Sequence, residues 1–415
     1  SIISLPWSIK LLYGLVADNF PICGSTRKAY LLLSGLISFL SLLPLVFHPD
    51  PTNTFLKSPK VITACLTLNG MAGAFVDVII DALMVQQSRK DPIYGSEDLN
   101  SYSWLWLSVG GASGCFLAAY LTQYLDPYYS FMICEIVCTL LAMVAFHLND
   151  EIDQEASESY NQLMRKHNAE DASSFQRVAI TGRLIWKNTK NKAIYQTLLY
   201  FLMIGVLVPS FGDVQYYFTL NVLHFSKFTF SLLNLLSFLS LFAGILLYNK
   251  FFKNFEIRTM LQMSIVFGLI GCTGGLVLVY RWNVDYLGVS DLAFVVVTSM
   301  LSGTFALAFS FLPTLVLFTK ITPNHIEASM FALFTGVFNF SGNVAGPLVG
   351  SYVCKAMGVD SDHLDKMSSL LLIQMACLVV SFSYIFLVPR NSELNELQAR
   401  NIKESELEKA NHSEL

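Results

Sequence analysis

The sequence predicts an all-α membrane protein that crosses the bilayer many times, and its composition gives the first reason. Charged residues make up 13% of the chain and hydrophobic residues 54%, whereas soluble domains carry about 25% charged residues. The mean hydropathy is +0.53. This composition excludes an ordinary soluble domain and predicts a multi-pass protein of the plasma membrane or of an organelle membrane.

The second reason is a regular alternation of apolar segments with short polar turns. Most of these segments approach the roughly 20 residues that a helix needs to cross the hydrocarbon core. We therefore expect spans at residues 1–16, 30–47, 61–86, 101–124, 128–147, 193–220, 228–249, 259–280, 291–319, 327–354 and 367–389. Five of these precede the longest polar interval and six follow it. Because the chain begins with Ser1 in an apolar run, we expect that the first helix of a six-plus-six arrangement is missing.

The polar interval, residues 149–191, divides an N-terminal membrane half (1–148) from a C-terminal one (192–389). Within it, the segment from Phe175 to Trp186 mixes apolar and basic side chains, which predicts a cytoplasmic helix lying at the membrane interface. Residues 390–415 form a polar, Glu-rich tail that we expect to fray.

Basic residues are concentrated at alternate ends of the predicted spans, which by the positive-inside rule face the cytoplasm. These clusters are Arg27-Lys28, Arg89-Lys90, Arg165 to Lys192, Lys250 to Arg258, Lys320 and Arg390.

Asp77 and Asp81 lie inside the apolar run from Val61 to Val85. Their spacing of four places both carboxylates on one face of a helix, about 6 Å apart along its axis. Each charge costs roughly 2.5–3.5 kcal/mol near a bilayer centre on insertion scales, so this face should point inward. Lys10 has a comparable predicted depth and is expected to meet both carboxylates. A purely structural intramembrane ion pair is the alternative.

Other polar residues and glycines are candidates for supporting roles. Glu135, near the middle of its span, is a candidate second proton site or cavity residue. Asp213 and Glu327 fall near span ends, which predicts gate or cap groups. Small residues at a spacing of four predict close helix packing, either static or between faces that slide; these are Gly110, Gly114, Gly342, Gly346 and Gly350.

The segment Gly14-Leu-Val-Ala-Asp18, followed by Arg27-Lys28, resembles a cytoplasmic loop of the major facilitator superfamily. In that superfamily this loop latches the cytoplasmic side. The resemblance implies that Asp18 accepts hydrogen bonds from the N-terminus of a neighbouring helix and that Arg27 pairs with acidic helix ends. Such a latch can form and break.

A narrower resemblance covers essentially the whole chain. Four motifs resemble those of the folate-biopterin transporter family within that superfamily: Pro6-Trp7-Ser-Ile-Lys10, Asp77-Val-Ile-Ile-Asp81, Pro209-Ser-Phe-Gly-Asp213 and Glu327-Ala-Ser-Met-Phe331. The chain departs from that pattern at Leu11, where the family often has Pro, and at Ala328-Ser329, where Gly or Thr often follows the glutamate. These departures leave the substrate more open than the fold.

The resemblance implies a bundle of two six-helix halves that transports a pterin- or folate-like molecule by alternating access. A pteridine ring presents two parallel N–H donors that match one carboxylate. We expect Asp77 to take that role while Asp81 pairs with Lys10, and proton symport through either aspartate is a hypothesis. The partners expected are a small-molecule substrate, protons and the lipid bilayer, with a monomeric protein and no nucleic acid.

Three alternatives stay open beside this interpretation. The chain could be a carrier of a different organic solute, a transport-dead sensor or scaffold, or an integral membrane enzyme. The sequence shows no His-rich metal cluster, G-x-S-x-G elbow or HExxH pair, which are signatures of catalytic sites. We therefore expect no enzyme activity, no catalytic residue, no metal and no cofactor.

Overall fold

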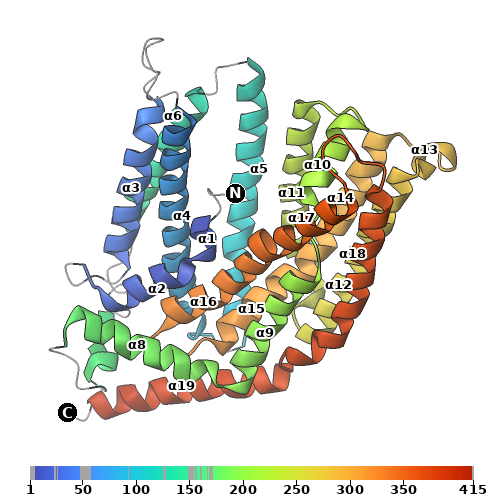
Figure 1. Ribbon diagram of the computed structural model, residues 1–415. Helices are drawn as coiled ribbons and strands as arrows, with labels where there is room; N and C mark the ends of the chain where they lie inside the picture. Colours follow the sequence, from blue (N-terminus) through green and yellow to red (C-terminus); the bar gives the residue numbers. More distant parts are fainter. Residues whose placement is uncertain are drawn as a thin grey trace.

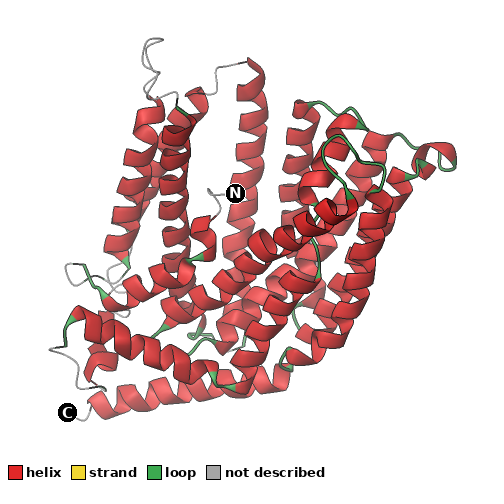
Figure 2. Cartoon of the chain, viewed as in Figure 1, coloured by secondary structure: helices red, strands yellow, loops and turns green. Residues whose placement is uncertain are grey.

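The structure is a computed structural model that describes residues 5–22, 25, 27–46, 58–91, 93–124, 128–147, 154, 157–158, 161–165, 167 and 172–413. In these ranges the chain is built from helices joined by turns and loops, and no strand is found beyond an isolated bridge between Ile22 and Ser25 (Figure 2). The predicted all-α class is therefore confirmed.

The N-terminal half consists of helices that stand side by side (Figure 1). α3 packs against both α4 and α6, and α5 stands beside them on the side that faces the C-terminal half. The helices are α1 (Leu5–Ser8), α2 (Lys10–Asn19), α3 (Lys28–Val46), α4 (Pro59–Ser88), α5 (Gly95–Tyr124) and α6 (Tyr128–Phe146).

The C-terminal half follows the linker helix α8 (Ser174–Thr189) and contains three π-helical segments: η2 ends the helix begun by α11, η3 joins α14 to α15, and η4 joins α16 to α17. Such wide turns are frequent at functional sites. The elements are α9 (Lys192–Leu207), α10 (Gly212–Asn221), α11 (Lys227–Leu247), η2 (Tyr248–Phe252), α12 (Ile257–Val279), α13 (Trp282–Asp285), α14 (Asp291–Ala306), η3 (Leu307–Phe311), α15 (Leu312–Ile321), α16 (Glu327–Phe340), η4 (Ser341–Ala345), α17 (Gly346–Met357), α18 (Met367–Ser381) and η5 (Phe382–Leu387).

Nine helices in the described part of the chain are long and apolar enough to cross a membrane. They coincide with nine of the eleven predicted spans. The described residues of the other two predicted spans are also mostly helical, but these spans differ in form. In the first, from Leu5 onward, α1 and α2 are separated at Ile9; in the second, α16 continues through η4 into α17. Both carry buried polar groups, such as Lys10 and Glu327, which lower the apolar character of these segments.

The two halves meet most closely at the end of the molecule where α8 and α19 (Asn391–Ser413) lie (Figure 1). We call this the inner end, because the positive-inside rule assigns it to the cytoplasm. Here α2 and α4 pack against α16, and α5 packs against α11 and α15. Toward the opposite end the ribbons of the two halves diverge (Figure 1).

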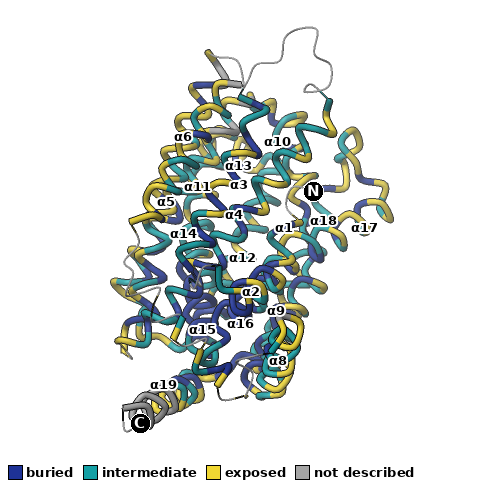
Figure 3. Tube along the Cα trace, turned by 90° about the vertical axis from the view of Figure 1, so that its left-hand side faces the viewer, coloured by how far each residue is buried: buried dark blue, intermediate teal, exposed yellow. Residues whose placement is uncertain are grey.

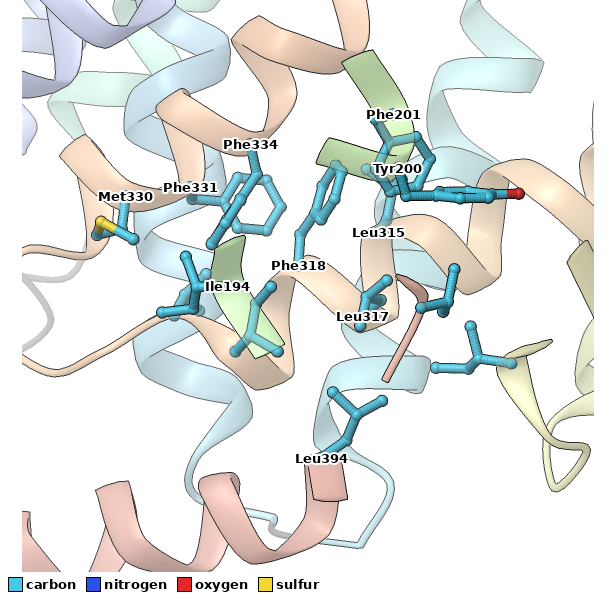
Figure 4. Close-up of a cluster of buried hydrophobic side chains, with 14 of the residues drawn as sticks. Ile194, Tyr200, Phe201, Leu315, Leu317, Phe318, Met330, Phe331, Phe334 and Leu394 are labelled. Atoms are coloured by element: carbon cyan, nitrogen blue, oxygen red, sulfur yellow. The ribbon is translucent and has the colours of Figure 1, made fainter. Parts of the chain in front are cut away.

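Burial is greatest at the inner end, around α15 and α16 (Figure 3). The largest apolar cluster joins these two helices to α9, and its aromatic rings interlock (Figure 4). Phe318 stacks on Phe334 at 5.3 Å and meets Phe201 edge-on at 5.2 Å. Leu394 of α19 closes the cluster from the cytoplasmic side. This close packing gives the polar groups beside it a fixed frame.

The linker segment that was predicted to form a helix at the membrane interface is helical, as α8. Ser173 begins it with a capping box, in which its hydroxyl accepts from the backbone of Gln176 and the Gln176 side chain accepts from the backbone of Ser173. These reciprocal bonds satisfy donors that a helix start leaves unpaired.

The expected fraying of the C-terminal tail is wrong, because α19 is helical from Asn391 to Ser413. Its start is fixed by a backbone hydrogen bond from Asn391 to Glu256 at 2.9 Å. Leu394 is 1% exposed, and Asn401 donates to the carbonyl of Thr322 at 3.2 Å. One polar helix can therefore be held by a few buried side chains on a single face.

Candidate transport site and inner-end contacts

Lys10 forms the centre of a buried charge cluster in the N-terminal half. It begins α2 directly after the break at Ile9, and its side chain is buried. The ammonium group contacts the carboxylate of Asp77 and lies 3.8 Å from that of Asp81, both on α4. The structure therefore brings together the three residues that were expected to meet.

The order of pairing differs from the expected one. Lys10 approaches Asp77 more closely than Asp81, so Asp81 is not its principal partner. Both carboxyl groups lie beside the same ammonium group. The Asp77 side chain is 28% exposed and that of Asp81 11%, which leaves Asp77 the more accessible of the two.

Helix α16 of the C-terminal half covers this cluster. The Asn339 amide donates to the carbonyl of Trp7 at 3.4 Å, and the Lys10 ammonium lies 5.1 Å from the centre of the Trp7 ring. A Cβ on Gly336 would lie 3.7 Å from the carbonyl oxygen of Ser8. Sequence reasoning missed Asn339, because a single amide in an apolar helix carries no spacing signal.

The predicted latch residues Gly14 and Asp18 lie against the start of α16. Asp18 accepts hydrogen bonds from both the backbone N–H and the hydroxyl of Ser329, each at 2.7 Å. Arg27 donates to the other oxygen of Asp18 at 3.2 Å. A Cβ on Gly14 would lie 2.6 Å from the backbone oxygen of Ala328, so only glycine permits this approach. Lys28, next along the chain, lies over the ring of Phe146.

Glu327 lies at the inner end, as expected for a gate or cap group, and it joins the two halves. Arg89 at the end of α4 pairs with it at 2.5 Å and also donates to the carbonyls of Thr322 and Pro323. The arginine thus also satisfies backbone oxygens where α15 ends. Arg89 was noted only for the sign of its charge, since the sequence gives no partner across 238 positions.

Further ion pairs join α5 to the C-terminal half. Glu97 pairs with Lys320 at 2.8 Å, and Asp98 pairs with Lys253 at 2.5 Å. Between the helices Asn100 donates to the hydroxyl of Thr319 at 3.0 Å. Sequence reasoning missed Glu97, because it lies before the predicted span at 101–124, whereas α5 begins at Gly95 and has Glu97 in its first turn.

Glu135 and Asp213 lie apart from these contacts. Glu135 is buried, and neither carboxylate oxygen has a hydrogen-bond partner among the described residues. One turn later Cys138 contacts Ser38 of α3 at 3.3 Å, so Glu135 belongs to the α3–α6 interface. Asp213 is exposed in the first turn of α10 and lines a cavity of about 440 Å³ together with Lys355.

The glycines divide between packed and open positions. An added Cβ at Gly110, Gly114 or Gly342 would meet nothing within 4 Å, whereas one at Gly111 would overlap the ring of Phe238 on α11. At Gly350 it would lie 1.9 Å from the backbone oxygen of Ser210, and at Gly346 3.3 Å from that of Ser341. The expected packing role therefore suits Gly346 and Gly350. In α5 the glycine in close contact is Gly111, and not the predicted Gly110 or Gly114.

A family model described as the BT1 family matches residues 1–407. The chain belongs to the BT1 family. The chain is similar to two proteins named probable folate-biopterin transporter 4 of Arabidopsis thaliana and folate-biopterin transporter of Synechocystis. The chain is 26% identical to each; the matches cover 94% of this chain and 87% of the first relative, and 92% of this chain and 72% of the second.

Solved structures show the same fold as this BT1 member. The proton:xylose symporter XylE matches with a TM-score of 0.66 at 12% identity, over 96% of this chain and 88% of that one. A bacterial homologue of ferroportin matches with a TM-score of 0.57 at 12% identity, over 93% and 87%. The predicted major-facilitator fold is thus confirmed. Family and fold are those of multi-pass membrane transporters, and not of membrane enzymes.

Proposed function

We propose that this chain carries a small pterin- or folate-class molecule across its membrane by alternating access, as a monomer. The N-terminal half (1–148) and the C-terminal half (192–389) move against each other around a site near the midplane. The observation that carries the proposal is the buried Lys10–Asp77–Asp81 cluster, which lies under α16 where the halves meet. The names of the two similar proteins support the substrate class.

In this proposal Asp77 recognises the ring. Its carboxylate is the more exposed of the pair, and it can accept two parallel N–H donors in bidentate fashion. Lys10 then either keeps its contact with Asp77 or turns toward an anionic group of the substrate. Asp81 behind them provides a second partner for the ammonium, so the lysine stays paired when a substrate takes Asp77.

The same cluster suggests proton coupling. One lysine beside two aspartates leaves one negative charge over when all three are ionised. A single proton on either carboxyl group neutralises that charge. We propose that a proton occupies this pair in one stage of the cycle and leaves it in another, which would make the carrier a symporter. Glu135 is a second candidate for a proton site.

We propose that the inner-end contacts form the gate. The Asp18–Ser329, Arg89–Glu327 and Glu97–Lys320 contacts all join one half to the other. Charge-assisted hydrogen bonds of this kind are strong but reversible, so they can hold one state without fixing it. Arg27 and Lys28 support the α2–α3 turn, and Asp213 is a candidate gate group at the opposite end.

Uptake into proteoliposomes tests the function directly. Purified protein should accumulate labelled folate or biopterin faster than protein-free vesicles, and unrelated organic anions should not compete. Asp77→Asn should reduce this uptake, whereas Asp91→Asn, at an exposed carboxylate of the same inner region, should not. Uptake of an unrelated solute would favour a different carrier. No uptake of any solute by folded protein would favour a sensor or scaffold.

A further inference from the structure

Helix α8 has two different faces. The inward face packs on the molecule: Thr181 is fully buried, and Leu184 and Ile185 contact the large apolar cluster. This attachment holds α8 in one orientation, so its opposite face has a fixed composition.

The outward face of α8 carries aromatic side chains. Phe175 and Trp186 are separated by eleven positions, close to three helical turns, and therefore share one face. Phe175 is 84% exposed and Trp186 68% exposed. Two large aromatic rings at the surface of a short helix are costly in water unless another phase covers them.

The same face is strongly basic. Arg183, Lys187 and Lys190 are all exposed, and α8 contains no acidic residue. In the described part of the chain no ion pair joins these three cations to a carboxylate. Lys190 lies 5.8 Å from the ring of Trp186, so charge and aromatic surface form one patch.

We propose that this patch binds the headgroups of anionic phospholipids in the cytoplasmic leaflet. Clustered Lys and Arg side chains on an amphipathic helix attract anionic lipid. Tryptophan and other aromatic rings prefer the headgroup level of the bilayer. A soluble phosphate could satisfy the cations but would leave Phe175 and Trp186 in water, so the lipid surface is the better occupant.

The patch is connected to the inner-end contacts. The buried Thr181 hydroxyl donates to the side-chain oxygen of Asn19 at 2.7 Å, and Asn19 follows Asp18 in α2. Headgroup binding on one face of α8 thus holds the end of α2 on the other. An anionic leaflet stabilises the state in which Asp18 contacts Ser329.

Quenching of tryptophan fluorescence by brominated lipid tests the proposal in proteoliposomes of the full chain. The contribution of Trp186 is the difference between the wild type and W186F. Brominated phosphatidylglycerol should quench this contribution more than brominated phosphatidylcholine at equal mole fraction. In R183Q/K187Q/K190Q the preference for the anionic lipid should fall by at least about tenfold.

A triple variant with the same charge change provides the control. K250Q/R390Q/R400Q removes three exposed cations elsewhere at the inner end and should keep the preference. F175A, which keeps all three charges of the patch, should weaken quenching by both lipids. F175A also tests the contact of α8 with lipid if the triple variant of α8 does not fold.

Three results would overturn the proposal. An equal loss of the preference for anionic lipid in the two triple variants would show that the preference arises from the overall surface charge and not from the patch on α8. Equal quenching by the two lipids in the wild type would remove the anionic preference. Competition by millimolar inorganic phosphate would show a soluble-anion site in place of a lipid site.

Discussion

Single residues determine the charge balance of the site. The positively charged Lys10 is buried beside two negatively charged aspartates. Its ammonium group contacts Asp77 and lies near Asp81. Removing a charge from such a cluster costs more than removing a matched pair, because a buried charge without a partner keeps its full desolvation penalty.

Lys10→Met should therefore destabilise the folded protein strongly, by about 3–5 kcal/mol if the pocket is dry. Lys10→Met combined with Asp77→Asn should recover much of that loss, since only one carboxyl then stays in the pocket. Thermal unfolding in detergent would rank the variants. A double variant that unfolds at a lower temperature than Lys10→Met would mean that the charges do not interact.

A second prediction concerns the loop between α17 and α18. Hydrogen bonds from the backbone of Asp362 and from the ring and backbone of His363 lower the pKa of Asp360 below 3.8. The same ring contact, followed by the charge of Asp360, raises the pKa of His363 above 6.5.

The stabilisation from His363 is complete below pH 6.5 and is lost as the pH rises through its raised pKa. That from Asp360 is present above pH 3.8 and is lost as the pH falls through its lowered pKa. An NMR titration of the His363 ring should show a pKa above 6.5, and Asp360→Asn should return it toward that value. A titration that is the same in both proteins would refute the pairing.

The site was only partly predictable from the sequence. Asp77 and Asp81 could be assigned to one inward face because their spacing is local, and Lys10 had a matching depth. Which aspartate lies nearer the lysine depends on side-chain packing that no spacing encodes. Arg89 and Glu327 meet across 238 positions, and such a pairing becomes visible only when the chain is folded.

Helices and their ends determine how closely the two halves approach. Nine spans and α8 could be predicted from length and hydrophobicity. Helix α19 could not, because its composition is polar and it is held by buried side chains such as Leu394. In α5 the packing glycine is Gly111 and not Gly110 or Gly114, since a spacing of four identifies a face only to within one residue.

The α2–α16 crossing provides the clearest test at this scale. Gly14→Ala places a Cβ 2.6 Å from a backbone oxygen, so the helices must separate and the sealed inner end should become less populated. Gly114→Ala, which meets open space, is the matched control. Electron-resonance distances between labels at Asp91 and Arg390, in a background without the eight native cysteines, should lengthen only in Gly14→Ala. Equal distances in both variants would contradict the tight crossing.

The whole molecule is sealed at one end by pairs that cross from half to half. Arg89→Glu should repel Glu327 and favour the state that opens to the cytoplasm, because the ion pair contributes to one state only. Arg89→Glu with Glu327→Arg should restore the original balance. Ser101 is buried between the halves. The rate at which a soluble reagent alkylates a cysteine introduced there would measure the balance between the two states. Unchanged accessibility in Arg89→Glu would show that this pair does not hold the gate.

The fold itself was predictable at this scale, because the superfamily's loop motif and the span count agreed with it. The state of the molecule, closed at the inner end, was not predictable, because the same sequence adopts every conformation of the transport cycle. The coupling between charge cluster and gate therefore requires measurement of transport.

Uptake driven by an imposed pH gradient measures that coupling most directly. Proteoliposomes with the wild-type chain should accumulate labelled biopterin or folate against its gradient when the donor side is acid, and collapse of the pH gradient should abolish the accumulation. The variant that removes the proton-carrying carboxyl group, either Asp77→Asn or Asp81→Asn, should lose the pH-driven component of uptake. Accumulation that is unchanged in both single variants would contradict the account.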